Sequence, residues 1–111
     1  MDSKWFVKKD ELVAVQQKPG LVRRTMSYNG DIMMCIFEQD TGICVDLHKH
    51  DAVQNGYVVS GKLKFFKEDG SFVIAEAGDS YAFESNEWHG SECLEHAVFI
   101  ENFTPCRKEY I

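Results

Sequence analysis

Short runs of apolar and β-branched residues alternate with turn signals along the whole chain. Residues 32–37 and 72–75 are of types that favour extended strands. Polar and apolar side chains alternate over residues 62–65, so we expect one face of that strand to contact solvent. Residues 97–100 are all apolar and predict a strand that is buried on both faces.

Turn residues separate these runs at short and even intervals. The pair Asn29-Gly30 is a typical hairpin signal, and further turns are expected at 39–42, 60–61, 68–71, 78–79 and 86–87. Strands this short, at this spacing, indicate a β-sandwich or a β-barrel. Only residues 10–15 hint at a helical period.

The N-terminal segment is less regular than the rest and ends at the pair Pro19-Gly20. We therefore divide the chain into an N-terminal arm, residues 1–20, and one barrel domain, residues 21–111. The arm carries Trp5, Phe6 and Val7, whose apolar surface needs a partner. That partner is either the barrel of the same chain or a second subunit.

Composition narrows the classes of function. A chain of 111 residues, of which 44 % are hydrophobic, is long enough for one domain with its own core. Its net charge is −6 and its 12 basic residues are scattered, which argues against binding to nucleic acid or to an anionic membrane. The sequence shows neither a membrane-span pattern nor a secretory pattern, so we predict a cytoplasmic protein with four reduced cysteines: Cys35, Cys44, Cys93 and Cys106.

Three histidines and one glutamine are candidate metal ligands. His48 and His50 lie two positions apart, so on a strand they point to the same side of the sheet. Gln54 follows past a bend, and His89 comes after a Gly-Asp turn. Imidazole is the commonest protein ligand for transition metals. Three imidazoles and one amide carbonyl leave coordination positions open, as a catalytic metal requires.

The ligand set limits the metal without choosing it. It admits Ni, Mn, Fe, Co or Zn. Because Gln54 is neutral, the full charge of the metal remains available to polarise a bound oxygen. Asp46 shares the parity of His48 and is either a partner that orients an imidazole or a surface carboxylate, whereas Lys49 and Asp51 point outward.

The spacing of these residues resembles that of the cupin family. The first cupin motif is matched at every spacing, with glutamine in place of its usual glutamate, by Gly42, His48, His50, Gln54 and Gly61. The second motif is matched by Gly78 and His89, and its usual proline, second glycine and terminal asparagine are replaced by Glu84, Asn86 and Cys93. The resemblance implies an all-β, single-domain jelly-roll barrel, a double-stranded β-helix, with the metal inside one mouth. Such barrels have one long exposed sheet, so we expect a homodimer.

The chain is similar in particular to the KdgF-type cupins, which linearise unsaturated ketouronates released from pectin and alginate. Those proteins also have glutamine as the fourth ligand, and the likeness extends over residues 21–111, including the tail 103–110. They have an aspartate two positions before the first phenylalanine of that tail, where this chain has Glu101. The resemblance implies a carboxylated small-molecule substrate and a proton-transfer role for Glu101.

The residues themselves support an acid/base group and an anchor. Glu101 shares parity with Phe99 and Phe103 on an apolar strand, and a desolvated carboxylate beside a metal is a natural general acid or base. Arg107 is a candidate to bind the substrate carboxylate by a bidentate fork, or else a surface arginine paired with Glu109. Arg23 and Arg24 alternate in direction, so at most one of them faces the cavity.

Two other classes of function remain open at this point. An Fe(II)-dependent cupin dioxygenase would use the open coordination positions for O₂ and would consume it during turnover. A non-catalytic module would bind metal or a small molecule without turnover and would be indifferent to loss of Glu101.

Overall fold

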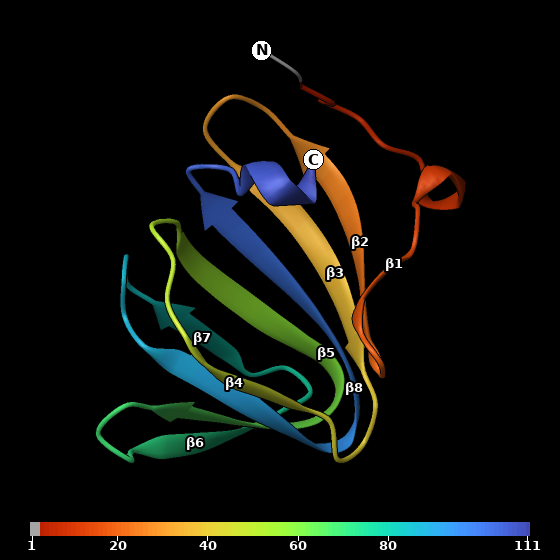
Figure 1. Cartoon of the computed structure of the whole chain (residues 1–111). Coiled ribbons are helices and arrows are strands. Elements are labelled where there is room, and N and C mark those ends of the chain that lie inside the picture. The colour runs from red at the N-terminus through yellow and green to blue at the C-terminus, as the bar shows by residue number, and fades with distance from the viewer. Residues whose placement is uncertain (1–2) are drawn as a thin grey trace.

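The structure is a computed structural model that describes residues 3–111. Its elements in chain order are η1 (Lys9–Glu11), β1 (Val15–Lys18), β2 (Leu21–Tyr28), β3 (Met33–Gln39), β4 (Cys44–His48), β5 (Val53–Lys67), β6 (Phe72–Glu76), β7 (Ser80–Phe83), β8 (His89–Thr104) and η2 (Lys108–Tyr110). Strands dominate, and η1 and η2 are single 3-10 turns (Figure 1). The predicted all-β, single-domain jelly roll is confirmed. Within the described part of the chain, we find no helix with the length and apolar character needed to span a membrane.

The two longest strands, β5 and β8, connect the two layers of the barrel. They pair antiparallel with each other over most of their length. The second half of β8 also pairs with β3, and its first half pairs with β4. In the same way, the first half of β5 pairs with β7 and its second half with β6. Both strands bend, so the layers face each other across the interior (Figure 1).

Gly61 lies at the bend of β5, where the sequence predicted a turn. That prediction is wrong, because β5 continues through Ser60 and Gly61 without reversing. Gly61 has a φ of 85°, and a Cβ there would lie 2.1 Å from the carbonyl oxygen of His96, so only glycine fits. The pairing register shifts on both sides of Ser60, as in a β-bulge. The bulge changes which side chains face inward, from Val58 before it to Leu63 after it.

Alternation along the strands builds the core. On β3 the odd-numbered residues from Met33 to Gln39 are buried and the even-numbered ones are half-buried on the outer face. The predicted alternation of residues 62–65 is confirmed, with Leu63 and Phe65 inside. Each large apolar side chain that is fully buried contributes about 1.5–3 kcal/mol. The largest apolar members of the core are Met33, Phe37, Leu63, Phe65, Phe83, Phe99 and Phe103.

The outer face of the larger layer carries several apolar side chains. Residues 97–100 were expected to be buried on both faces, and this is wrong: Ala97 and Phe99 are buried, whereas Val98 and Ile100 are half-buried on the outer side. The pairing register places Ile100 between Ile36 on β3 and Tyr57 on β5. This side of the sheet therefore presents a continuous row of apolar side chains toward solvent.

The part of the N-terminal arm that precedes β1 makes few contacts with the barrel. Lys4 pairs with Tyr28 through backbone hydrogen bonds, yet the side chains of Trp5 and Phe6 are 92 % and 65 % exposed. The barrel of the same chain is therefore not the partner of these two side chains. The hint of a helix at residues 10–15 corresponds only to η1 at its start. Strand β1 pairs with β2 and so joins the last residues of the predicted arm to the sheet.

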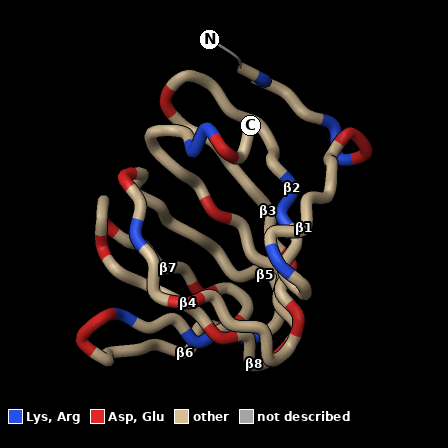
Figure 2. The backbone as a smooth tube through the Cα atoms, viewed as in Figure 1, with Lys and Arg blue, Asp and Glu red and all other residues tan. Residues whose placement is uncertain are grey.

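Charged residues and cysteines are distributed without a dominant cluster. Basic and acidic residues are interspersed along the tube in Figure 2, with several acidic ones in the loops. All four cysteines are free: Cys35 and Cys93 are buried, Cys44 is exposed and Cys106 is half-buried. A cytoplasmic location stays a prediction.

Candidate metal centre

Three histidines from two neighbouring strands and one loop form a compact cluster. His48 is the last residue of β4 and is the register partner of His89, the first residue of β8. His50 follows two positions after His48, beyond the end of the strand. One ring nitrogen from each of the three lies within 4.8 Å of the others. The sequence spacing thus predicted a real convergence of side chains.

The hydrogen bonds of the three rings prepare one nitrogen of each as a ligand. The Nδ1 atoms of His48, His50 and His89 lie 2.9, 2.8 and 2.7 Å from the backbone carbonyls of Asp46, Ala52 and Glu87. A carbonyl only accepts, so each Nδ1 carries the proton and each Nε2 keeps a lone pair. The Nε2 atoms of His50 and His89 are buried and have no hydrogen-bond partner among residues 3–111. Buried lone pairs without a donor fit a cation among them.

Burial also keeps two of the rings, those of His89 and His50, neutral. Desolvation lowers the pKa of His89 to about 4, with a smaller contribution from the neighbouring His48. Desolvation and the charge of Arg107 lower the pKa of His50. A histidine must be deprotonated at one nitrogen to bind a metal, so both rings are ready to do so at neutral pH. The ring of His89 is further fixed by stacking on Phe83, at a centroid distance of 4.2 Å.

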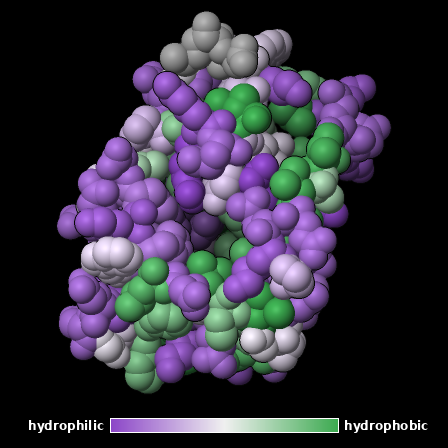
Figure 3. Space-filling model, viewed as in Figure 1, coloured by the Kyte–Doolittle hydropathy of each residue, from purple (hydrophilic) through white to green (hydrophobic). Residues whose placement is uncertain are grey.

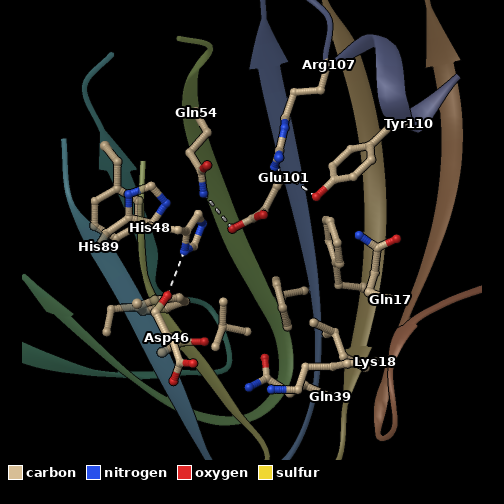
Figure 4. A pocket seen from close by; sticks show the side chains of 18 residues that line it. Gln17, Lys18, Gln39, Asp46, His48, Gln54, His89, Glu101, Arg107 and Tyr110 are labelled. Carbon is tan, nitrogen blue, oxygen red and sulfur yellow. Dashed lines mark hydrogen bonds between the residues drawn. The ribbon is translucent and has the colours of Figure 1, made fainter. Parts of the chain in front are cut away.

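Asp46 orients an imidazole in a different way from the one expected. Its backbone carbonyl, not its carboxylate, accepts the hydrogen bond from Nδ1 of His48. The residue still lines the cavity beside His48 (Figure 4). The sequence therefore indicated the residue but not the atom.

Gln54 and Glu101 are joined by a hydrogen bond inside the barrel. Nε2 of Gln54 donates to Oε2 of Glu101 at 3.0 Å (Figure 4). Both residues are buried, with 7 % of each exposed. Because the carboxylate engages the nitrogen of the amide, the carbonyl oxygen of Gln54 is the atom left for a metal. Glu101 thus fixes the orientation of the fourth candidate ligand.

Glu101 is the acidic residue of the cavity whose ionisation is most perturbed. Desolvation raises its pKa to about 7. The hydrogen bonds from Tyr81 and Gln54 and the positive charge of Arg107 lower this pKa, but by less than desolvation raises it. A carboxyl group with a pKa near neutrality can both accept and return a proton. The sequence expected Glu101 to face the cavity, and the structure places it there.

Arg107 reaches the cavity from the tail that follows β8. Its Nη1 donates to the hydroxyl of Tyr110 at 2.8 Å, and its Nε donates to Glu109 at 3.0 Å. The pairing with Glu109 considered from the sequence therefore exists, yet the guanidinium also lines the cavity (Figure 4). Arg23 points inward but lies over the ring of Tyr110, 4.2 Å from its centroid, and does not line this cavity. Arg24 is on the outer face, 3.8 Å from Glu38.

The cavity lies between the two layers and has a volume of about 340 Å³. Figure 3 shows a hollow near the middle of the molecular face. Its wall combines polar side chains, among them His48, His89, Gln54 and Glu101, with the apolar residues Leu21, Phe37, Val45, Phe65 and Phe99. Such a volume suits a small molecule that combines charged oxygens with an apolar edge.

Sequence reasoning missed two features of this site. Gln17 and Lys18 of β1 line the cavity, although β1 was assigned to the arm. Tyr81 of β7 donates from its hydroxyl to Oε2 of Glu101 at 2.7 Å. Its parity with Phe83, an inward residue of the same short strand, was the available signal.

Comparison with known proteins agrees with this geometry. A family model described as "Cupin domain" matches residues 35–101. The pectin degradation protein KdgF of Dickeya dadantii (strain 3937) is 33 % identical over 94 residues, which cover 83 % of this chain and 84 % of that protein. The chain belongs to the cupin family. The resemblance to KdgF-type cupins seen in the sequence is confirmed.

Two solved cupin structures are similar along nearly the whole chain. An RmlC-like cupin from Shewanella frigidimarina NCIMB 400 has a TM-score of 0.90 at 27 % identity and covers 98 % of this cupin and 97 % of its own chain. KdgF from Halomonas sp. has a TM-score of 0.88 at 28 % identity, with 96 % of this cupin and 99 % of that chain covered. The arm and the barrel of this cupin thus both fall within the region of similarity.

Proposed function

We propose that this cupin is a metal-dependent enzyme that linearises an unsaturated ketouronate. The observation that carries the proposal is the hydrogen bond between Gln54 and Glu101. It joins the fourth candidate metal ligand to an acid/base group in one cavity. The similarity to proteins named KdgF, one of them described as a pectin degradation protein, supports the substrate class.

The candidate ligands fit a divalent transition metal, and their donor atoms admit Ni, Mn, Fe, Co or Zn. His48, His50, His89 and the carbonyl oxygen of Gln54 would hold it. When bound, it would polarise the oxygens of the substrate as a Lewis acid.

Glu101 is the residue that we propose to move the proton. Opening the cyclic form removes the proton of the anomeric hydroxyl, breaks the bond between the anomeric carbon and the ring oxygen, and leaves an aldehyde and an enolate. The enolate then takes a proton on carbon and becomes the ketone, so no proton is gained or lost overall. Because the pKa of Glu101 is raised to about 7, its carboxylate can take the first proton and its acid form can return one. Oε2 is occupied by Gln54 and Tyr81, so Oε1 is the oxygen available for this transfer.

Arg107 is the group that we propose to bind the substrate carboxylate. Its guanidinium lines the same cavity as Glu101. The hydroxyl of Tyr110 and the carboxylate of Glu109 hold two of its nitrogens, which pre-orients the fork. Of the described residues, Lys18 also brings a cation to the cavity wall, and its Nζ donates to the carbonyl of Cys44 at 2.6 Å.

The proposal is tested by following ring opening of unsaturated galacturonate by NMR with the metal-loaded protein. We expect a rate clearly above the spontaneous one, without consumption of O₂. O₂ uptake that requires Fe(II) would support the dioxygenase instead. Metal and ligand binding without any turnover would support a non-catalytic module, and either result would refute the proposal.

We also propose that two copies of this cupin associate through the outer face of the larger layer. The row formed by Ile36, Ile100 and Tyr57 supports this, because continuous apolar patches on a sheet face mark association surfaces. The exposed Trp5 and Phe6 of the arm would then pack on the second subunit. We expect light scattering to give twice the mass of one chain and Ile100→Glu to give a monomer. A monomeric wild type would contradict the proposal.

A further inference from the structure

The hydroxyl of Tyr81 reaches Glu101 although the two residues lie on strands that are not neighbours. Tyr81 is on β7 and Glu101 on β8, and β5 runs between them. The ring of Tyr81 packs on Phe65, with a centroid distance of 4.1 Å. Its hydroxyl then donates to Oε2 of Glu101 at 2.7 Å. The phenol thus crosses over the middle strand to reach the carboxylate.

Gly56 provides the space for this crossing. It is the register partner of Tyr81 on one side and of Glu101 on the other. A Cβ on Gly56 would lie 2.2 Å from Cζ and 2.3 Å from the hydroxyl oxygen of Tyr81. Its φ does not lie in the left-handed region, so the backbone does not require glycine here. A glycine inside a strand, with ordinary backbone, indicates a close approach of another group, which in this protein is the phenol.

The hydroxyl of Tyr81 stays protonated and therefore always donates its hydrogen bond to Glu101. Burial, followed by the charge of Glu101, raises the pKa of Tyr81 well above its usual value. Tyr81 therefore keeps its proton across the physiological range and holds the carboxylate without exchanging a proton with it. Tyr81 and Gln54 donate to the same oxygen, Oε2, and among the described residues no side chain donates to Oε1. Two donors on one oxygen fix the plane of the carboxyl group and leave the other oxygen free.

We propose that Tyr81 is a positioning residue for Glu101. The absence of a side chain at Gly56 leaves the space that the phenol of Tyr81 occupies. This role rests on the function proposed above, because it assumes that Glu101 carries the proton. Tyr81 does not line the cavity, so it acts through the carboxylate and not by binding substrate.

The test is Tyr81→Phe in the metal-loaded enzyme, which removes only the hydroxyl. Mutation of groups in the outer shell of a metal site, of which the Tyr81–Glu101–Gln54 chain is an example, typically costs about 10–100-fold in metal affinity or activity. We expect kcat for unsaturated galacturonate to fall by about 10-fold or more, with KM and metal content near wild type. Tyr28→Phe is the matched control, since Tyr28 is a half-buried strand tyrosine outside the cavity, and it should leave kcat unchanged.

Gly56→Ala tests the same contact without touching either partner. We expect it to lower kcat like Tyr81→Phe, and the double variant to be no slower than the slower single variant, because both changes break one hydrogen bond. Multiplied losses in the double variant, an unchanged kcat in Tyr81→Phe, or a loss of metal would overturn the role of Tyr81. If Gly56→Ala does not fold, Tyr81→Phe and its control decide alone. Absence of turnover in the wild type would instead refute the proposed function itself, and with it this role.

Discussion

Glu101→Gln is expected to lower the turnover of unsaturated galacturonate by about 10²–10⁴-fold, the usual contribution of general acid–base catalysis. The substitution keeps the size of the side chain and its ability to accept the hydrogen bonds of Gln54 and Tyr81. It removes the titrating oxygen. Metal content and folding should therefore stay near wild type while the rate of ring opening, followed by NMR against the spontaneous rate, falls.

Two further variants sharpen this result. Glu101→Asp keeps a carboxyl group, on a side chain shorter by one methylene, and introduces the aspartate expected from the resemblance to KdgF-type cupins. This variant should therefore be more active than Glu101→Gln. Glu95→Gln makes the same chemical change at an exposed position of the same strand, β8, and should leave the rate unchanged. Equal rates for wild type and Glu101→Gln would exclude Glu101 as the proton carrier.

His50→Ala is expected to abolish metal binding while the barrel still folds. Wild-type protein should carry about one divalent transition metal per chain, because the described residues contain one group of three histidines whose ring nitrogens lie within 4.8 Å of one another. The core consists of apolar strand residues that do not depend on the cluster. Among the described residues the buried Nε2 of His50 has no hydrogen-bond partner, so within the protein the substitution costs only the hydrogen bond from Nδ1 to the carbonyl of Ala52.

Elemental analysis and far-UV circular dichroism separate the outcomes for this variant. Loss of metal with a nearly unchanged spectrum is the expected result. His96→Ala is the control, since His96 is exposed and lies beside Glu38 and Asp40, away from the cluster. A variant that keeps its metal would show that His50 is not a ligand. Global unfolding would show that the metal is structural, and the catalytic interpretation would then be wrong.

The sequence by itself determined the strands and the candidate ligands, because both depend on short-range spacing. Alternation over a few residues decides which side chains of a strand share a face, so Leu63 and Phe65 could be assigned to one side. The spacing of His48 and His50, read with the cupin motifs, predicted a cluster that includes His89. The parity that Glu101 shares with Phe99 and Phe103 likewise predicted that it faces the interior.

Only the tertiary structure decided how strands that are distant in sequence are aligned. The contact of Tyr81 with Glu101 requires the register of three strands and a glycine in the middle one. The bulge at Gly61 changes the inward parity of β5, which a regular alternation cannot reveal. The choice between Arg23 and Arg107 depends on the path of the tail after β8. In each case the deciding quantity is a pairing register, which is fixed by packing and hydrogen bonds between segments and not by the residues adjacent in the chain.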